Sequence, residues 1–321
     1  MKHEGPKMRR VLCALDMGRS SSTSLSLASL LAERFHASVD ALYATPAVPA
    51  FDHSAARVKR LISEHNAQDR MTRMLADIKR RVCISSFVTR GDATAVILAH
   101  SKRQGSDLIV MASSPNRHFA GGRSTIEAVT AQAACAVLTA GDAFEAAPLR
   151  QILLPVGPAG VEPDALSWVT ALAERFNAAI GVLRIGQPRS GLWKLFTTTG
   201  EAAPRALGRS SVEYSEMLSA MARKGIETYE IEHPGGGDAS AVSNLCGSGR
   251  FDAVVVGLPP IEHGESDSNS WVSPVRLRTS VPILSVRSHG SRALFASSQF
   301  RAQCGSARST ENLAQAAWRD G

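Results

Sequence analysis

The residues best suited to chemistry in this 321-residue chain form a basic, glycine-containing loop in its first half. The loop carries Arg117 and His118, followed by the segment Gly121-Gly122-Arg123-Ser124. Positive side chains attract a phosphate group, and glycines let phosphate oxygens approach backbone N–H groups closely. The chemistry that this loop favours is therefore noncovalent phosphate binding.

Two features qualify that interpretation. Ser124 is followed three residues later by Glu127, just before a helical pattern, which predicts a capping box worth about 1 kcal/mol; this role is compatible with a phosphate contact. The corresponding loop of the second half carries Glu262, Glu265 and Asp267, which would repel a phosphate. A nucleotide site is therefore expected in the first half only.

Catalytic and metal-binding patterns are absent from the sequence. There is no G-x-S-x-G elbow and no Gly-rich loop followed by a Walker lysine. The nine histidines do not group at metal-ligand spacing, and the five cysteines form no C-x-x-C pair. We expect no catalytic residues, no metal and no enzyme activity.

Cysteine use and hydropathy bear on location. Cys13 and Cys135 lie in apolar, strand-like runs and are expected to be reduced, buried thiols. The first ten residues have no apolar stretch typical of a secretory signal, and no apolar run is long enough to span a membrane. These features predict a cytoplasmic protein without membrane contact.

The sequence repeats itself. Leu31–Phe35 (LAERF) recurs as Leu172–Phe176, at an offset of 141 residues. Gly91–Val96 recurs as Gly237–Val242, with one Thr replaced by Ser, at an offset of 146. Because the matching blocks keep their order, they predict a duplication.

Each copy alternates short apolar strands with amphipathic helices, a pattern typical of a parallel sheet covered on both faces. The fold class expected is α/β, with two tandem doubly wound domains, each a mostly parallel five-stranded sheet flanked by helices. In the first copy the strands are expected at 10–16, 37–45, 82–89, 107–112 and 135–140, and the helices at 21–35, 54–80, 92–104 and 124–133.

The domain boundaries follow from the repeat. The first domain is expected at 8–141 and the second, degenerate one at 150–287. The remaining residues, 288–321, are rich in Ser, Ala, Arg and Gln, which predicts a disordered tail. The short link between the copies indicates that the two domains pack together.

The net charge of +7 comes mainly from the first half. Many of its basic residues lie between Arg57 and Arg81, interleaved with Glu64, Asp69 and Asp77 and without alternating aromatic residues. This pattern indicates a solvated helix face and no nucleic-acid partner.

Several of these segments together resemble the universal stress protein family, over nearly all of residues 8–287. They are the strand ending in Leu15-Asp16, the Gly91-Asp92 pair, the strand Asp107–Met111 and the segment Cys135–Leu138. The resemblance implies a Rossmann-like sheet of the HUP type, and ATP binding through a glycine-rich motif, as in many members.

The resemblance also implies where an adenine nucleotide would bind. The residues it assigns to the first half are Ala14, Leu15, Asp16, Ala44, Met111, Ala112, Gly122, Arg123, Ser124 and Thr125. The family's glycines, however, fall on Ala112, Pro115 and Arg123, with a shortened spacer. In the second half they fall on Gly257, Pro260 and Asn269, and the strand-end acid is replaced by Gly157.

Two functions remain open on these grounds. The first is a regulatory protein of the stress response that binds ATP or a related adenine nucleotide in its first domain. The second is a nucleotide-free module for protein interaction or dimerisation. In either case Cys135–Thr139 and Val281–Val286 are expected to pair within one chain; a homodimer and an unknown protein partner are further expectations.

Overall fold

The computed structural model describes Pro6 and residues 8–18, 20–46, 55–76, 78–113, 124–141, 144–157, 160–186, 214–232, 237–258 and 272–287. At 55–64, 79, 113 and 277 it describes the backbone alone. The described residues all belong to one compact unit, Met1–Ser288. The expected tail, 288–321, lies outside them.

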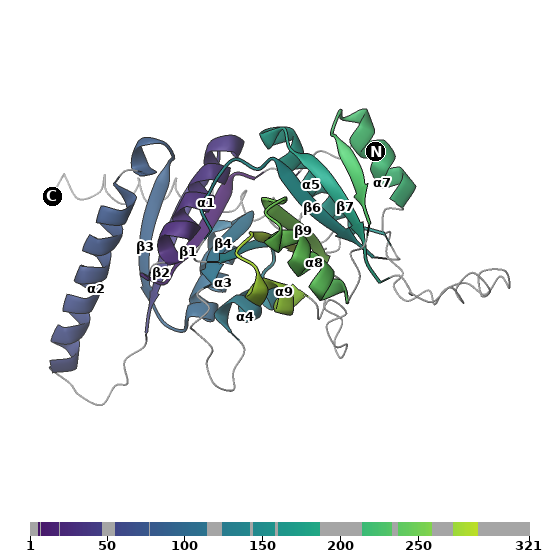
Figure 1. The fold of residues 1–321 in the computed structure, drawn as a ribbon. Helices are drawn as coiled ribbons and strands as arrows, with labels where there is room; N and C mark the ends of the chain where they lie inside the picture. Colours follow the sequence, from purple (N-terminus) through teal and green to yellow (C-terminus); the bar gives the residue numbers. More distant parts are fainter. Residues whose placement is uncertain are drawn as a thin grey trace. The chain divides into compact units, whose positions relative to one another are not determined.

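The first half alternates strand and helix as its apolar pattern predicts (Figure 1). Its elements are β1 (Arg10–Leu15), α1 (Ser20–Phe35), β2 (Ser38–Thr45), α2 (Ala55–Leu75), η1 (Ile78–Arg80), β3 (Ile84–Arg90), α3 (Ala93–Gln104), β4 (Leu108–Ser113), α4 (Thr125–Gln132) and β5 (Ala136–Gly141).

The expectation of one continuous helix over 54–80 is wrong. Helix α2 ends at Leu75, and a separate turn of 3-10 helix, η1, follows it. Ile78 of η1 packs against the core, and Val82 is buried just before β3 begins. Burial of these two side chains outweighs continuation of the helix.

The second half repeats the alternation. Its described elements are β6 (Gln151–Val156), α5 (Pro163–Phe176), β7 (Ala179–Arg184), α7 (Tyr214–Arg223), β8 (Thr228–Ile231), α8 (Asp238–Gly247), β9 (Ala253–Leu258), α9 (Val272–Arg278) and β10 (Ile283–Arg287).

Within the described residues all ten strands form one sheet, in the order β3-β2-β1-β4-β5-β10-β9-β6-β7-β8. Every ladder within a half is parallel, and the halves join through an antiparallel ladder between β5 and β10. The expected pairing of these two strands within one chain is therefore present. Its central pair is Leu138 with Leu284, which occupy the same position in the two repeats.

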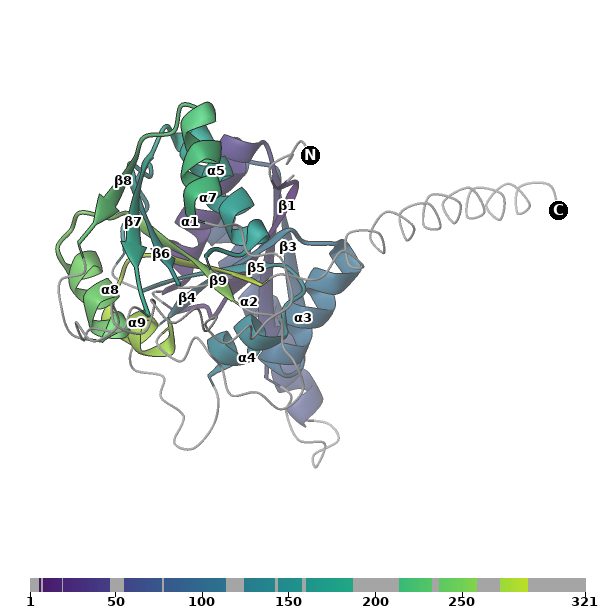
Figure 2. The same cartoon turned by 90° about the vertical axis from the view of Figure 1, so that its right-hand side faces the viewer.

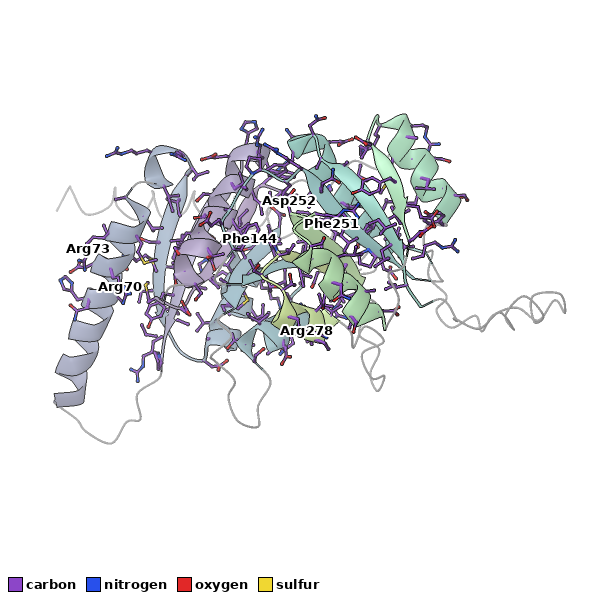
Figure 3. The ribbon with its side chains drawn as sticks, viewed as in Figure 1. Arg70, Arg73, Phe144, Phe251, Asp252 and Arg278 are labelled. Atoms are coloured by element: carbon purple, nitrogen blue, oxygen red, sulfur yellow. The ribbon has the colours of Figure 1, made fainter. Side chains whose placement is uncertain are left out.

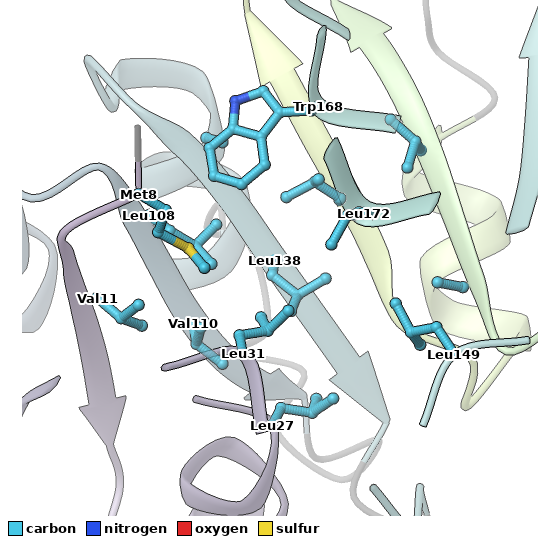
Figure 4. Packing of buried hydrophobic residues seen from close by; sticks show 14 of the residues in the cluster. Met8, Val11, Leu27, Leu31, Leu108, Val110, Leu138, Leu149, Trp168 and Leu172 are labelled. Atoms are coloured by element: carbon cyan, nitrogen blue, oxygen red, sulfur yellow. The ribbon is translucent and has the colours of Figure 1, made fainter. Parts of the chain in front are cut away.

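The helices cover the two faces of the sheet differently (Figures 1 and 2). Side chains from α1, α2, α5 and α7 contribute to a single buried cluster that continues across both halves. On the other face, α3 and α4 cover one cluster, and α8 and α9 cover another. Figure 4 shows the shared cluster, where Trp168 and Leu172 of α5 lie near Leu138 of β5.

The repeated LAERF segment lies where the halves meet. The guanidinium of Arg34 stacks over the ring of Phe176 at 5.3 Å, and that of Arg175 stacks over Phe35 at 5.6 Å. Each copy of the segment thus contacts the other copy reciprocally, as in a two-fold symmetric dimer interface.

A repeated aspartate fixes the start of each central strand. The Asp107 side chain accepts hydrogen bonds from the backbone N–H groups of Arg9 and Arg10, at 2.8 and 3.0 Å. Asp252, labelled in Figure 3, does the same for Arg150 and Gln151, at 2.7 and 2.9 Å. This matching pair of residues is structural.

Candidate functional site

The carboxyl ends of β1 and β4 part from each other in the first half. Their ladder ends at the pair Cys13–Val110, although β1 continues to pair with β2 as far as Leu15–Tyr43. The strand order reverses at this point of the sheet, and such a switch point is where open α/β sheets bind ligands.

Three of the residues assigned by sequence lie on one face of the sheet near these strand ends. Ala14 and Met111 belong to the cluster covered by α3 and α4, and Ala44 is half-buried on the same face, two residues after Leu42. Leu15 instead lies in the shared core on the opposite face. Ala112 follows Val110 in the strand alternation and so has its side chain on that opposite face too. Leu15 and Ala112 could contact a ligand only through their backbone.

Asp16 follows β1 and holds the turn into α1. Its Oδ1 accepts hydrogen bonds from Gly18 N at 2.7 Å and from Ser21 Oγ at 2.9 Å, while Oδ2 accepts one from Ser20 Oγ at 2.8 Å. The intervening Met17 has a positive φ of 57°. The carboxylate therefore has a structural role at the helix start.

The N-terminus of α4 is described from Ser124 onward. Ser124 Oγ accepts a hydrogen bond from Glu127 N at 3.2 Å, and Glu127 Oε2 accepts one from Ser124 N at 3.1 Å. The predicted capping box is confirmed. Thr125, half-buried, is the first helical residue. Gly122 and Arg123, like the rest of the basic loop, lie outside the described residues.

The corresponding strand ends of the second half are filled by larger side chains. Through the strand registers Ala44 corresponds to Ile185, which is 7% exposed and lies in the apolar cluster under α8 and α9. Pro155 stands in place of Ala14, and Gly157 in place of Asp16. The opening found in the first half is thus more crowded in the second.

Gly257, the single motif glycine retained there, has a packing role. A Cβ at this position would lie 3.1 Å from Glu162 Cβ and 3.3 Å from Ala165 Cβ. The close approach of α5 explains this glycine without a ligand.

The structure also reveals a buried polar cluster that the sequence reasoning missed. His100 Nε2 lies 3.3 Å from Asp40 Oδ2, and both residues are almost completely buried. Arg10 Nη1 lies 3.8 Å from the same carboxylate oxygen, and Arg103 Nη2 lies 3.4 Å from His100 Nδ1. Burial lowers the pKa of His100, and its hydrogen bond to Asp40 opposes that shift. An aspartate inside the apolar strand β2 was the signal that could have predicted it.

A second missed residue is Arg276 on α9, which is 9% exposed. Its Nε donates to Thr139 Oγ1 of β5 at 3.1 Å, and its Nη2 donates to Ser285 Oγ of β10 at 3.2 Å. Burial lowers the pKa of this guanidinium, and the charge of Glu127 opposes the shift. Arg276 therefore bridges the two strands that join the halves.

The described cysteines and acids offer little reactive chemistry. Cys13 is buried and free, as expected, whereas Cys135 is only half-buried; burial raises the pKa of Cys135 to about 11. In the described part of the chain no group of three His, Cys, Asp or Glu side chains could hold a metal ion. Nor does that part contain a helix both long and apolar enough to cross a bilayer.

The sheet order and its covering helices together define an α/β protein of the Rossmann-like type, built from two similar halves. Residues 7–140 match the model of the universal stress protein family. The first half of this chain is therefore similar to that family. No curated protein sequence is significantly similar to it.

Solved structures extend the likeness to both halves. A universal stress protein from Archaeoglobus fulgidus DSM 4304 is 12% identical, with a TM-score of 0.62 over 87% of this chain and 96% of that one. A protein of unknown function from Pseudomonas aeruginosa PAO1 is 16% identical, with a TM-score of 0.54 over 87% and 92%. At such low sequence identities, these TM-scores and coverages show a shared fold alone. A universal stress protein in complex with cAMP is 17% identical, with a TM-score of 0.32 over 42% of this chain and 98% of that one.

Proposed function

We propose that the first half of this chain binds an adenine nucleotide, ATP or a related one, and that the protein acts as a regulatory binding protein of the stress response. Binding rather than catalysis is its task, in the cytoplasm, with a protein and not a nucleic acid as the partner that responds. The match of residues 7–140 to the universal stress protein family model supports the stress-response role.

The observation that carries the proposal is the opening between β1 and β4 beyond Cys13–Val110. Ala14, Ala44 and Met111 line one face of it, so an adenine ring would meet small or flexible apolar side chains. The phosphates would then lie toward Thr125 at the N-terminus of α4, where backbone N–H groups and the helix dipole favour negative charge.

The negative charge at the N-terminus of α4 means that a phosphate there would need a positive side chain from the preceding loop. Glu127 places a carboxylate at the N-terminus and already binds Ser124 N. A triphosphate would be repelled by this carboxylate, so Arg123, with Gly122 beside it, supplies the compensating charge in our proposal. Arg123→Glu should therefore weaken binding more for ATP than for AMP.

The sharpest test fills the opening. Ala44→Ile copies Ile185 of the second half and should weaken nucleotide binding by at least about tenfold, because the larger side chain takes the space of the ring. Ala99→Ile adds the same groups to an exposed position of α3 and should leave binding unchanged. Isothermal titration calorimetry with ATP, ADP and AMP measures both variants.

Absence of any heat with these nucleotides at millimolar concentration would refute the proposal. Binding that survives Ala44→Ile would place the site elsewhere. If no nucleotide binds, a nucleotide-free interaction module is the better description. The hydrogen bonds that already engage Asp16 and the closure of β5 on β10 within one chain favour that second candidate.

A further inference from the structure

The two outer strands of the ten-stranded sheet carry opposite charge. Beside and at the end of β3, the exposed side chains include Arg80, Arg81 and Arg90. Beside and within β8, they include Glu227, Glu230 and Glu232. Neither strand has a buried residue, unlike the interior strands, so within the described residues these are the least covered strands of the sheet.

Neighbouring charges modify this contrast without removing it. Asp92 follows the β3 edge, where it caps α3. Beside β8, Arg184 lies 3.9 Å from Glu230, Arg223 is exposed at the end of α7, and Lys224 lies 2.9 Å from Glu174. On α2, which packs beside β3, Arg70 and Arg73 add exposed positive charge (Figure 3). Asp69, on the same helix, lies 3.4 Å from His65.

Strand direction makes the two edges geometrically compatible. Strands of the first half are parallel to one another and antiparallel to those of the second half, because β5 and β10 join them. Adding β8 of another copy in the same orientation beside β3 would therefore continue the sheet with an antiparallel pair. In that arrangement the end of β3 preceded by Arg81 lies toward Glu232, just after β8, and the Arg90 end lies toward Glu227, just before β8.

We propose that copies of this chain associate head to tail, with the basic β3 edge of one copy pairing with the acidic β8 edge of the next. Charged edges usually prevent sheet-to-sheet association. Here equal edges repel each other, β3 from β3 and β8 from β8, while unlike edges attract. The charges thus select the contact between unlike edges, a heterologous contact that can repeat from one copy to the next.

The salt dependence distinguishes this contact from nonspecific association. With a net charge of +7, two copies repel each other on average, and low salt strengthens that repulsion. Edge-to-edge attraction predicts the reverse: association that is stronger at 50 mM than at 500 mM NaCl, by about tenfold. Sedimentation velocity over a concentration series measures it.

Charge reversal supplies the decisive test. Arg81→Glu with Arg90→Glu makes the β3 edge acidic, and Glu227→Lys with Glu232→Lys makes the β8 edge basic. Each double variant alone should stay monomeric, and an equimolar mixture should associate again, because each now carries edges that match the other. Arg9→Glu with Lys102→Glu, two exposed residues away from both edges, is the control for net charge and should associate at least as well as the wild type.

Far-UV circular dichroism checks that every variant is folded. A wild-type chain that stays monomeric at all concentrations in 50 mM NaCl would overturn the proposal. So would association that neither edge variant weakens, or folded variants whose mixture stays monomeric.

Discussion

Residues at matching positions in the two halves carry different chemistry. Through the strand registers Asp40 corresponds to Gly181, and His100 corresponds to Cys246 at the repeat offset of 146. A Cβ at Gly181 would lie 2.8 Å from the Phe251 ring, so an apolar side chain occupies the space there. The buried Asp40–His100 pair is therefore specific to the first half.

This pair should make the stability of the fold depend on pH. The pKa of His100 is lowered by burial in the folded state, whereas the unfolded chain binds the proton at the ordinary histidine pKa. Between these values the unfolded state binds more protons, so the free energy of unfolding falls as the pH drops below about 6.5. Asp40 opposes the shift, while Arg103 and Arg10 add to it.

Urea unfolding at pH 7.5 and pH 5.5 measures the effect. His100→Asn removes the titrating group and should reduce the loss of stability on acidification. His36→Asn replaces an exposed histidine with a residue that also tolerates its positive φ, and should keep the wild-type loss. Equal losses in His100→Asn and wild type would contradict the assignment.

Sequence predicted residue roles where the partners lie close in the chain. The Ser124–Glu127 capping box spans three residues and is confirmed. The Asp40–His100 contact spans sixty residues and depends on how α3 packs against β2, which no local pattern encodes. Whether Ala44 and Met111 contact a nucleotide stays a prediction.

At the level of elements, apolar runs predicted the strands because the interior strands are buried on both faces. The end of α2 was not predictable from its pattern, since it depends on burying Ile78 and Val82. The contact between α9 and the β5–β10 pair was also not predictable from the sequence pattern. At the repeat offset Arg276 corresponds to Thr130, so the duplication gave no sign of a buried arginine.

Substitutions of Arg276 test how α9 is held against β5 and β10. Its guanidinium is buried against two neutral hydroxyl groups, Thr139 and Ser285, so desolvation offsets much of what the hydrogen bonds contribute. Arg276→Met keeps the apolar stem and should change the free energy of unfolding by less than about 1 kcal/mol, in either direction. Arg276→Ala leaves a cavity and should cost about 2 kcal/mol or more.

Chemical denaturation of the two variants compares these effects directly. A loss in Arg276→Met as large as that in Arg276→Ala would mean that the charge, rather than the packing of the stem, holds α9 on the two strands. Lys102→Met, at an exposed position on α3, provides a control for replacing a cation with methionine.

For the whole molecule, the sequence predicted the duplication. The structure gives a reason why the LAERF segment is identical in the two halves. The LAERF segments contact each other through Arg34–Phe176 and Arg175–Phe35. Identical residues suit an interface in which each half presents the same surface to the other. Periodicity could find the repeat, but it could not reveal that the two copies touch.

The shared core predicts that the two halves unfold together. One buried cluster holds Leu31 of α1, Leu138 of β5 and Trp168 of α5, and the connecting segment contributes Leu149, which is 5% exposed. Unfolding either half would expose apolar surface of the other at a cost of about 25 cal/mol per Å², so a state with one half folded is disfavoured.

Thermal unfolding followed by far-UV circular dichroism and by tryptophan fluorescence should give coincident midpoints. Leu138→Ala, at the junction, should lower both midpoints together. Val242→Ala, in the separate cluster under α8, is the control for shortening a buried apolar side chain away from the junction. Two resolved transitions in the wild-type chain would show instead that the halves are energetically independent, held together by the β5–β10 ladder without a common core.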